Sequence, residues 1–335
     1  MKKTMFFEKL DEKKVQCRLC PHNCKISDGK KGICAVRENK EGILYSLSYE
    51  NVNTMHIDPI EKKPLYHFYP GEKAMSIATM GCNLSCRFCQ NADLSQTPRI
   101  TKIHGEKVTP DEIVRATERN DCKIIAYTYS EPTIFYELAY ETAVKASKKG
   151  IKNVFVSNGY INPKPVKKIS PVLDAANIDL KSFRKEFYMD VCGSRLQPVL
   201  ETIRLMKKLG IWLELTTLLI PGKNDSEQEI KDIAQFIASV DKNIPWHISR
   251  FHPDYKMRDS GYTPLEKMNL AFNIGKKTGL NYIYLGNVPS REHNDTICHS
   301  CKNHIIRRAN FYVKENHIED GKCGFCKETI PGVFS

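Results

Sequence analysis

A repeated junction between a helix end and an apolar run constrains what this chain can fold into. Each copy places lysines in the last turn of an expected helix and a glycine at or just past its end, which suits the helix dipole and the glycine cap. Three copies of one helix-to-strand junction predict repeated βα units. The copies are ASKKG before IKNVFV (146–156), MKKLG before IWLELT (206–216) and GKKTG before LNYIYL (275–285).

The apolar runs that follow such junctions are short and rich in β-branched residues. They are apolar on both faces, as parallel strands covered by helices must be. A chain of 335 residues accommodates one barrel of about 250 residues with small appendages. The sequence therefore predicts an α/β fold with a full or partial (β/α) barrel. The expected strands are 75–80, 123–129, 153–158, 175–180, 212–220, 246–251 and 281–287.

Three of the intervening helices have recognisable start patterns. Each pattern combines a hydroxyl residue for the N-cap with an acid three residues later, and two of them add a proline at the first helical position. In such a barrel, the chemistry is expected at the C-terminal ends of the strands. The patterns are Thr109-Pro110 with Glu112, Thr263-Pro264 with Glu266, and Ser226 with Glu229.

The segment GCNLSCRFCQN (81–91) follows the first expected strand and contains Cys82, Cys86 and Cys89. Three thiols suit a metal centre that keeps one coordination position open for a substrate or cofactor. Thiolates also hold iron–sulfur clusters. A zinc site completed by a distant histidine is the alternative, and three core cysteines without a metal would be unusual in so short a segment.

Eight further cysteines form two sets near the chain ends. The C-terminal set has two C-x-x-C knuckles, which predicts a zinc ribbon or a rubredoxin-like iron site. The N-terminal set is irregularly spaced, so zinc and a second iron–sulfur cluster both stay open, and His22 is expected to have a structural role. Cys122 and Cys192 stand alone and are expected to be small buried residues. The two sets are Cys17, Cys20, Cys24 and Cys34, and Cys298, Cys301, Cys323 and Cys326.

Composition limits the partners and the compartment. The net charge is +12, but the lysines are spread along the chain in pairs near helix ends, which is typical of solvated faces. Nucleic acid is therefore not an expected partner. The apolar run near the N-terminus is too short for a signal peptide, and no stretch is long enough to span a membrane. We expect a cytoplasmic protein, in whose reducing compartment clustered thiols bind metal.

The segment C-N-L-S-C-R-F-C (82–89) resembles the C-x-x-x-C-x-x-C signature of the radical S-adenosylmethionine (SAM) superfamily, including the aromatic Phe88. The resemblance implies a [4Fe–4S] cluster on Cys82, Cys86 and Cys89, with SAM as the ligand of the open iron. It also implies reductive cleavage of SAM to a 5′-deoxyadenosyl radical that abstracts hydrogen. The protein would then orient the cofactors and exclude side reactions.

Polar residues at later strand ends match further features of this superfamily. The family keeps a Gly-Gly-Glu-Pro-like turn where this chain has Tyr-Ser-Glu-Pro, so the glycines are absent while the acid and the proline match. The resemblance implies SAM contacts from Ser130 and Glu131 to the ammonium group, from Ser157 and Asn158 to the ribose and methionine, from Asp179 and Lys181 near the carboxylate, and from His252 near the ribose.

Each of these residues also has a plainer explanation. Ser130-Glu131-Pro132 is an ordinary helix start, because serine caps the helix and glutamate favours its dipole. Asp179 and Lys181 could form a structural ion pair, and a single histidine after a strand is often structural. The structure must decide which arrangement is present.

Over its whole length the chain resembles the AmmeMemoRadiSam-system radical SAM enzymes, relatives of pyruvate formate-lyase activating enzyme. The order of C-x-x-C-P-H-x-C, D-P-I-E-K-K-P-L-Y-H-F (58–68), the three-cysteine loop and the closing G-K-C-G-F-C-K-E-T-I-P-G-V-F carries this resemblance. It implies AMMECR-family and Memo-family partners and a low-potential electron donor such as flavodoxin or ferredoxin. Lys62, Lys63 and His67 are expected to face a substrate.

The expected organisation has four parts. Residues 1–40 form a metal-binding extension, 41–74 a connecting segment packed beside the barrel, 75–290 the radical SAM barrel, and 291–335 a zinc-ribbon or rubredoxin-like module. The leading hypothesis is a radical SAM enzyme with an unidentified substrate. The alternatives are an activase that installs a glycyl radical on a partner protein and, from a different class, a zinc-dependent nucleic-acid-binding protein.

Overall fold

Seven parallel strands form the centre of the structure, which is a computed structural model that describes residues 1–289 and 293–335. Each strand pairs in parallel with the next one along the chain. All seven coincide with the strands expected from the sequence. They are β8 (Lys73–Thr79), β10 (Ile124–Tyr127), β11 (Lys152–Ser157), β12 (Ala175–Asp179), β13 (Trp212–Leu219), β14 (Trp246–Arg250) and β15 (Ile283–Gly286).

The sheet is a partial barrel. Its strand order is β15-β14-β13-β12-β11-β10-β8-β7-β9, so within the described ranges β15 and β9 are edges that do not pair with each other. The strand β7 (Asn51–Pro59) runs antiparallel to β8, and β9 (Glu106–Lys107) pairs with its start. The sequence analysis did not identify β7, because a half-exposed strand lacks the apolar run of a strand buried on both faces.

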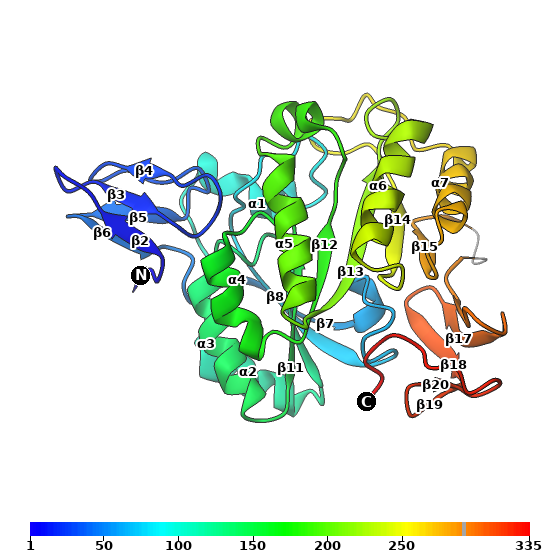
Figure 1. Cartoon of the computed structure of the whole chain (residues 1–335). Helices are drawn as coiled ribbons and strands as arrows, with labels where there is room; N and C mark the ends of the chain where they lie inside the picture. The colour runs from blue at the N-terminus through cyan, green and yellow to red at the C-terminus, as the bar shows by residue number, and fades with distance from the viewer. Residues whose placement is uncertain (290–292) are drawn as a thin grey trace.

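Six helices cover one face of this sheet, as Figure 1 shows. Apolar side chains of these helices pack on the strands in the larger hydrophobic core. No helix in the described part of the chain is long and apolar enough to cross a membrane. The six helices are α2 (Pro110–Arg119), α3 (Tyr136–Ser147), α4 (Pro163–Ile169), α5 (Leu196–Lys208), α6 (Glu227–Val240) and α7 (Leu265–Lys277), and a short α1 (Ala92–Ser95) follows the cysteine loop.

The three expected helix starts have different outcomes. At α2, Thr109 and Glu112 form the full capping box. At α6, Ser226 caps the helix, but the Glu229 side chain turns away to accept hydrogen bonds from Ser182 and Phe183. The capping prediction at α7 is wrong, because Pro264 is the N-cap and no side chain caps it.

Thr263 has a tertiary role in place of capping α7. Its buried hydroxyl donates to the Leu219 carbonyl and accepts from the Phe251 N–H. These bonds join the ends of β13 and β14 to the chain that enters α7. Thr263 therefore fits the sequence pattern of an N-cap, but its hydroxyl satisfies the Leu219 carbonyl and the Phe251 N–H and not a backbone group of α7.

The face of the sheet opposite the helices is filled in its N-terminal half by residues 60–69, here called the inner segment. Ile60, Leu65 and Phe68 pack in a small apolar cluster with strand residues that include Ala74 and Ala126. Side chains two residues further along these strands, such as Ser76 and Thr128, point to the same face. The inner segment therefore occupies one half of this face and leaves the other half to the chemistry described below.

The buried carboxylate of Glu214, on β13, holds the inner segment in place. It accepts hydrogen bonds from the backbone N–H groups of Tyr66 and His67, at 2.9 and 2.7 Å, and from the Trp212 and His247 rings. Burial alone would raise the pKa of Glu214, but His247 and the other donors lower it. The ionised carboxylate thus satisfies two N–H groups of a segment that has no strand partner at these residues.

Two cysteine-rich regions flank the sheet at different places (Figure 1). The expected boundary between barrel and C-terminal module, at 290 and 291, lies outside the described residues. The N-terminal region contains the sheets β2-β3-β4 and β1-β6-β5, made of β1 (Lys2–Lys3), β2 (Phe7–Lys9), β3 (Val15–Cys17), β4 (Lys25–Ile26), β5 (Arg37–Lys40) and β6 (Ile43–Ser46). The C-terminal region contains β16 (Thr296–Ile297), β17 (His304–Ala309), β18 (Tyr312–Asn316), β19 (Ile318–Glu319) and β20 (Lys322–Cys323).

The first prediction concerns Glu214. We expect Glu214→Gln to lower the free energy of unfolding by about 2–4 kcal/mol, because the amide brings an N–H group toward donors that need an acceptor and removes the charge that pairs with His247. Denaturant unfolding measures this change. The matched control is Glu227→Gln on the exposed first turn of α6, expected within about 0.5 kcal/mol of the parent. Equal stability of the two variants would contradict the anchoring role.

Candidate active site

A cavity of about 320 Å³ occupies the C-terminal half of the inner face, between the inner segment and the loop that follows β8. Its walls come from the ends of five parallel strands, β10 to β14, and from the loop after β8, and its floor comes from Lys62, Lys63 and Pro64. This position agrees with the expectation that the chemistry lies at the C-terminal ends of the strands. The wall residues from the strands and the turns after them are Thr128, Val156, Ser157, Asp179, Thr216, Leu218 and Ser249, with Leu84 and Phe88 from the loop.

The loop that carries Cys82, Cys86 and Cys89 leads from β8 to α1 and is tied to two other parts of the chain. Ser85 and Arg87 donate their backbone N–H groups to the carbonyls of Cys192 and Val191, both at 2.9 Å. Gly81 has a φ of +111°, and a Cβ there would lie 2.6 Å from a Val36 methyl group. Glycine is therefore required at this turn.

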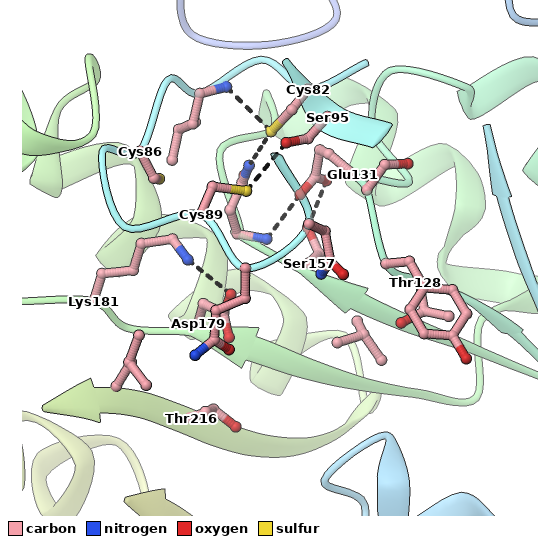
Figure 2. A pocket seen from close by; sticks show the side chains of 18 of the residues that line it. Cys82, Cys86, Cys89, Ser95, Thr128, Glu131, Ser157, Asp179, Lys181 and Thr216 are labelled. Atoms are coloured by element: carbon pink, nitrogen blue, oxygen red, sulfur yellow. Dashed lines mark hydrogen bonds and ion pairs between the residues drawn. The ribbon is translucent and has the colours of Figure 1, made fainter. Parts of the chain in front are cut away.

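The three thiols line the cavity from one side, as Figure 2 shows. The Cys82 sulfur accepts from the Leu84 N–H at 3.3 Å and from the Asn158 amide at 3.6 Å. The Cys89 sulfur lies 3.1 Å from the Ser95 hydroxyl. The three sulfurs are not drawn together within 4.8 Å of one another, unlike the C-terminal set described below. The loop therefore presents three separated sulfur ligands with room between them.

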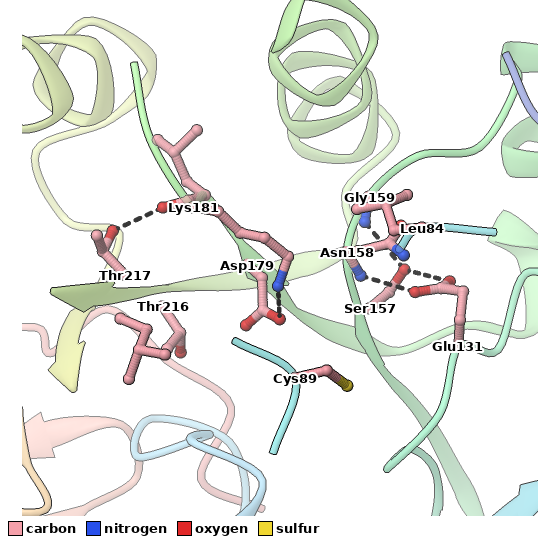
Figure 3. Close-up of polar contacts among 12 residues, drawn as sticks. Leu84, Cys89, Glu131, Ser157, Asn158, Gly159, Asp179, Lys181, Thr216 and Thr217 are labelled. Carbon is pink, nitrogen blue, oxygen red and sulfur yellow. Dashed lines mark hydrogen bonds and ion pairs between the residues drawn. The ribbon is translucent and has the colours of Figure 1, made fainter. Parts of the chain in front are cut away.

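Glu131, which follows β10, forms the centre of a buried hydrogen-bond network (Figure 3). One carboxylate oxygen accepts from the Thr133 N–H, the Thr133 hydroxyl and the Ser157 hydroxyl, at 2.6–3.0 Å, and the other accepts from the Asn158 N–H at 2.8 Å. Burial raises the pKa of Glu131, while these donors act to lower it. The second oxygen still has an acceptor position for one more donor.

The alternative that Ser130-Glu131-Pro132 starts a helix is wrong. The helix α3 begins at Tyr136 with Phe135 as its N-cap, and Glu131 is used by the network described above. Ser130 lines the cavity, and its buried hydroxyl has no hydrogen-bond partner among the described residues.

Asn158 connects the Glu131 network to the cysteine loop. Its side-chain amide donates to the side-chain oxygen Oδ1 of Asn83 at 2.8 Å, and the same amide reaches the Cys82 sulfur. The Ser157 hydroxyl, in contrast, is fully engaged, since it donates to Glu131 and accepts from the Gly159 N–H. The two neighbouring residues thus have different roles. The Ser157 hydroxyl holds the Glu131 carboxylate in place, and the Asn158 amide holds the cysteine loop in place.

Asp179 and Lys181, after β12, form the expected ion pair on the other side of the cavity, with Nζ and Oδ2 separated by 2.8 Å. Burial alone would lower the pKa of Lys181, but Asp179 and the neighbouring cysteine sulfurs raise it well above the ordinary value. The ammonium group also lies 5.6 Å from the centre of the Phe88 ring, which packs on Phe187. Figures 2 and 3 place Cys89 between this pair and the Glu131 network.

His252 lies at the edge of this arrangement. Its ring nitrogen is 3.1 Å from the Gln90 amide, and Gln90 lines the cavity whereas His252 is not among the lining residues. The structure therefore brings Phe88 and six of the seven residues expected to contact SAM to the cavity, and it places His252 outside the lining, in contact with Gln90.

The floor of the cavity contains a charged cluster whose chemistry the sequence analysis could not derive. Asp58 accepts from Lys62, Lys63, Ser76 and Tyr129. Burial alone would raise the pKa of Asp58, but these donors lower it. Burial lowers the pKa of Lys63 to about 8, against the opposite effect of Asp58. The expectation that Lys62 and Lys63 line a ligand site agrees with their place on the cavity floor.

The expectation for His67 is wrong, because this residue is fully buried under the sheet. One ring nitrogen lies 2.7 Å from the Pro331 carbonyl, so it must donate, and the other lies 2.6 Å from the Tyr284 hydroxyl. Burial lowers the pKa of His67 to about 4, which keeps the ring neutral. His67 is a structural residue of the inner segment.

Cys192 is a residue near the site that sequence reasoning missed. It was expected to be an isolated buried cysteine, but its carbonyl anchors the cysteine loop. Its thiol, against the effect of burial, lowers the pKa of Cys86. The sequence carries no local signal for this contact, since 106 positions of chain separate the two residues.

Neither of the two outer cysteine sets lines this cavity. The C-terminal thiols pair as Cys298 with Cys326 and Cys301 with Cys323, both at 3.7 Å, and all four sulfurs lie within 4.8 Å of one another. The four N-terminal cysteines line a separate small cavity. The expectation that His22 is structural agrees with its ring nitrogen lying 2.8 Å from the Asn83 carbonyl.

Comparison with known proteins bears on the family. An uncharacterized protein of Methanocaldococcus jannaschii is 45% identical over 337 residues, which cover all of both chains. A second protein of that organism, named among the glycyl-radical enzyme activating enzymes, is 26% identical over 68% of this chain and 92% of its own length. Among solved structures, Streptococcus suis SuiB bound to S-adenosylmethionine has a TM-score of 0.52 at 13% identity, over 69% of this chain and 53% of SuiB.

The radical SAM superfamily profile matches residues 76–237, a range that runs from β8 into α6. The range includes the three-cysteine loop, the Glu131 network and the Asp179–Lys181 pair. These matches agree with the partial barrel and with the loop that presents three separated thiols to a cavity. The chain belongs to the radical SAM superfamily.

Proposed function

We propose that this enzyme binds SAM beside a [4Fe–4S] cluster held by Cys82, Cys86 and Cys89, and that it uses radical chemistry to remove a hydrogen atom from a substrate. When bound, the cluster supplies the electron that cleaves SAM and yields the 5′-deoxyadenosyl radical. The observation that carries the proposal is that three thiols of one loop face a cavity that also presents Glu131, Ser130 and Lys181.

The residues present fit these cofactors. Three separated thiolates suit a multi-iron cluster with an open position better than a single tetrahedral ion. The cavity of about 320 Å³ falls within the range of about 300–1,000 Å³ found for small-molecule sites. The unpartnered hydroxyl of Ser130 and the remaining acceptor position on Glu131 are polar groups that a ligand would satisfy.

The side chains around the cavity divide the work of holding SAM. Lys181 is a fixed ammonium group, kept protonated by Asp179, and suits a carboxylate. Glu131 suits an ammonium group on the opposite wall. Asn158 holds the Cys82 sulfur and the loop in position, so the distance between the loop and both charged groups is set by hydrogen bonds. Phe88 and Leu84 keep water away from the thiols.

The substrate is proposed to enter the part of the cavity that the floor lines. There the ammonium groups of Lys62 and Lys63 share one carboxylate, that of Asp58, which leaves a net positive charge. An anionic or carbonyl group of a substrate would complement this floor. The hydroxyl of Tyr129 donates to the same carboxylate and covers it from the side of β10.

A glycyl-radical activase is the second candidate. The observation that favours it is the name of the relative with 26% identity, together with 25% identity over half of this chain to the 4-hydroxyphenylacetate decarboxylase activating enzyme of Clostridioides difficile. In this version the substrate is a backbone glycine of a partner protein, and a persistent glycyl radical on that partner would distinguish it. Flavodoxin or ferredoxin would supply the electron, and AMMECR-family or Memo-family proteins are the partners to test first.

The second prediction concerns SAM cleavage. The protein reconstituted anaerobically with iron and sulfide is expected to form 5′-deoxyadenosine from SAM and dithionite, whereas Cys82→Ala is expected to form none above background, because it loses an iron ligand. Chromatography of the products measures this. Cys122→Ala, a buried cysteine away from the cavity, is the matched control and should cleave SAM like the parent. Iron-loaded parent protein that forms no product would refute the proposal.

The third prediction concerns Lys181. We expect Lys181→Met to weaken SAM binding about 10- to 100-fold, since a charge-assisted contact with a carboxylate contributes about 1.5–3 kcal/mol. Equilibrium binding of SAM to the reconstituted protein measures this loss, with iron content checked in parallel. Lys223→Met, on an exposed turn after β13, should bind SAM as the parent does. An unchanged affinity in Lys181→Met would mean that the lysine only pairs with Asp179.

We further propose that the C-terminal set holds zinc. Tetrahedral zinc with Zn–S bonds of about 2.3 Å places its sulfurs about 3.8 Å apart. Within each of the two thiol pairs, the sulfurs lie 3.7 Å apart. Two of these cysteines, Cys298 and Cys323, pack with Tyr282 and Tyr284 in the apolar cluster that joins the module to β15. Zinc here would stabilise the module and its contact with the sheet.

The fourth prediction follows from this site. Cys298→Ala with Cys326→Ala is expected to remove about one zinc per chain and to lower the thermal midpoint by several degrees. Iron at the Cys82 loop should stay bound, because the two sites share no ligand. Elemental analysis and thermal unfolding measure these effects. Zinc content equal to that of the parent would contradict the assignment.

A further inference from the structure

The N-terminal cysteines Cys17, Cys20, Cys24 and Cys34 surround a small enclosed cavity of their own. Its volume of about 20 Å³ exceeds the about 10–15 Å³ that one water needs. The other walls combine four apolar side chains with the polar residues His22, Arg37, Asn83 and Thr133. With four cysteines around it, the space is suited to a group that thiols bind. The apolar wall residues are Leu19, Ile26, Ile33 and Ile134.

The grouping of these thiols differs from that of the C-terminal set. Among the described residues, the C-terminal set is the one group of metal-binding side chains whose ligand atoms all lie within 4.8 Å of one another. The N-terminal thiols and the three thiols of the Cys82 loop do not meet this condition. A zinc ion needs sulfurs about 3.8 Å apart. Thiolates around an iron–sulfur core stand further apart, because iron and sulfide atoms lie between them.

Arg37 gives a second and independent indication. Its guanidinium is buried, and two of its nitrogens donate to Glu137 and to the Ile134 carbonyl. The third, Nε, is buried without a hydrogen-bond partner, and Arg37 lines the four-cysteine cavity. A buried N–H donor without an acceptor is costly. The sulfurs of an iron–sulfur cluster accept such hydrogen bonds, and these bonds help to set its reduction potential.

The wall between this cavity and the active site is thin. Asn83 lines the N-terminal cavity, and its neighbour Cys82 lines the active-site cavity. His22 contacts the Asn83 carbonyl, and Gly81 packs against Val36, two residues after Cys34. The N-terminal region therefore packs directly on the cysteine loop, and a metal centre there would stand next to the catalytic one.

From these observations we infer that Cys17, Cys20, Cys24 and Cys34 hold a second [4Fe–4S] cluster, a site beyond the SAM chemistry proposed above. All four irons have protein thiolates, so this cluster has no open position for SAM. Loading is a ligand exchange: each cysteine displaces one thiolate ligand from an iron of a preassembled core, so one Fe–S bond breaks for each that forms, and the cysteine proton leaves on the displaced thiol. No electron is transferred in that step.

The test counts metals in variants that separate the two iron sites. The variant Cys82→Ala/Cys86→Ala/Cys89→Ala, loaded anaerobically with iron and sulfide, is expected to hold about four irons and the parent about eight. The reduced variant should show the electron paramagnetic resonance spectrum of a [4Fe–4S] cluster, and added SAM should leave that spectrum unchanged. The variant Cys20→Ala/Cys24→Ala should hold about four irons with a spectrum that responds to SAM.

Two outcomes would overturn the inference. One is a triple variant without iron, and the other is a parent with about two zinc ions and about four irons, which would assign zinc to the N-terminal set. Failure of the proposed SAM chemistry looks different, because the parent would then hold its iron and form no 5′-deoxyadenosine. The Cys122→Ala protein controls for loss of a buried thiol and should retain about eight irons.

Discussion

One buried carboxylate, that of Glu214, determines how the inner face of the sheet is used. A segment without strand partners can be buried only where its backbone N–H groups find acceptors. Glu214 provides these acceptors for Tyr66 and His67, and Asn177 donates to the Pro64 carbonyl nearby. The segment is thereby fixed over the N-terminal half of the strands. The cavity lies over the C-terminal half of the strands, and the positions of Pro64 and Lys63 determine how deep this cavity is.

The chemistry of the cavity depends on the alternation of side chains between the two faces of each strand. Residues that face inward near the strand starts build the apolar contact with the inner segment, and residues two or four positions later face the cavity. On β13 this gives Glu214 under the segment and Thr216 and Leu218 in the cavity. On β12 it gives Asn177 and then Asp179. Support and chemistry therefore share each strand, so a shift of register would disturb both at once.

The sequence predicted those parts of the structure that depend on local pattern. The seven parallel strands have continuous apolar runs, and the three cysteines within eight residues identify their loop without reference to the fold. No local signal reports three other features, because each depends on residues distant in the sequence. These features are the strand β7, the role of Thr263 and the contact of Cys192 with Cys86. Cysteine spacing predicted metal at both ends of the chain, whereas the close grouping of the four C-terminal sulfurs, within 4.8 Å of one another, is visible only in the structure.

The inner segment, which carries the cavity floor, is supported by residues from the far end of the chain. Val333 donates its N–H group to the His67 carbonyl and accepts from the Tyr69 N–H, and Arg308 donates to the Tyr66 carbonyl. Contacts across more than 240 positions form slowly, because a long loop must close before they can stabilise anything. During synthesis, the barrel strands leave the ribosome well before residue 333. The contacts that support the inner segment from Arg308 and Val333 can therefore form only after all seven barrel strands have been synthesised.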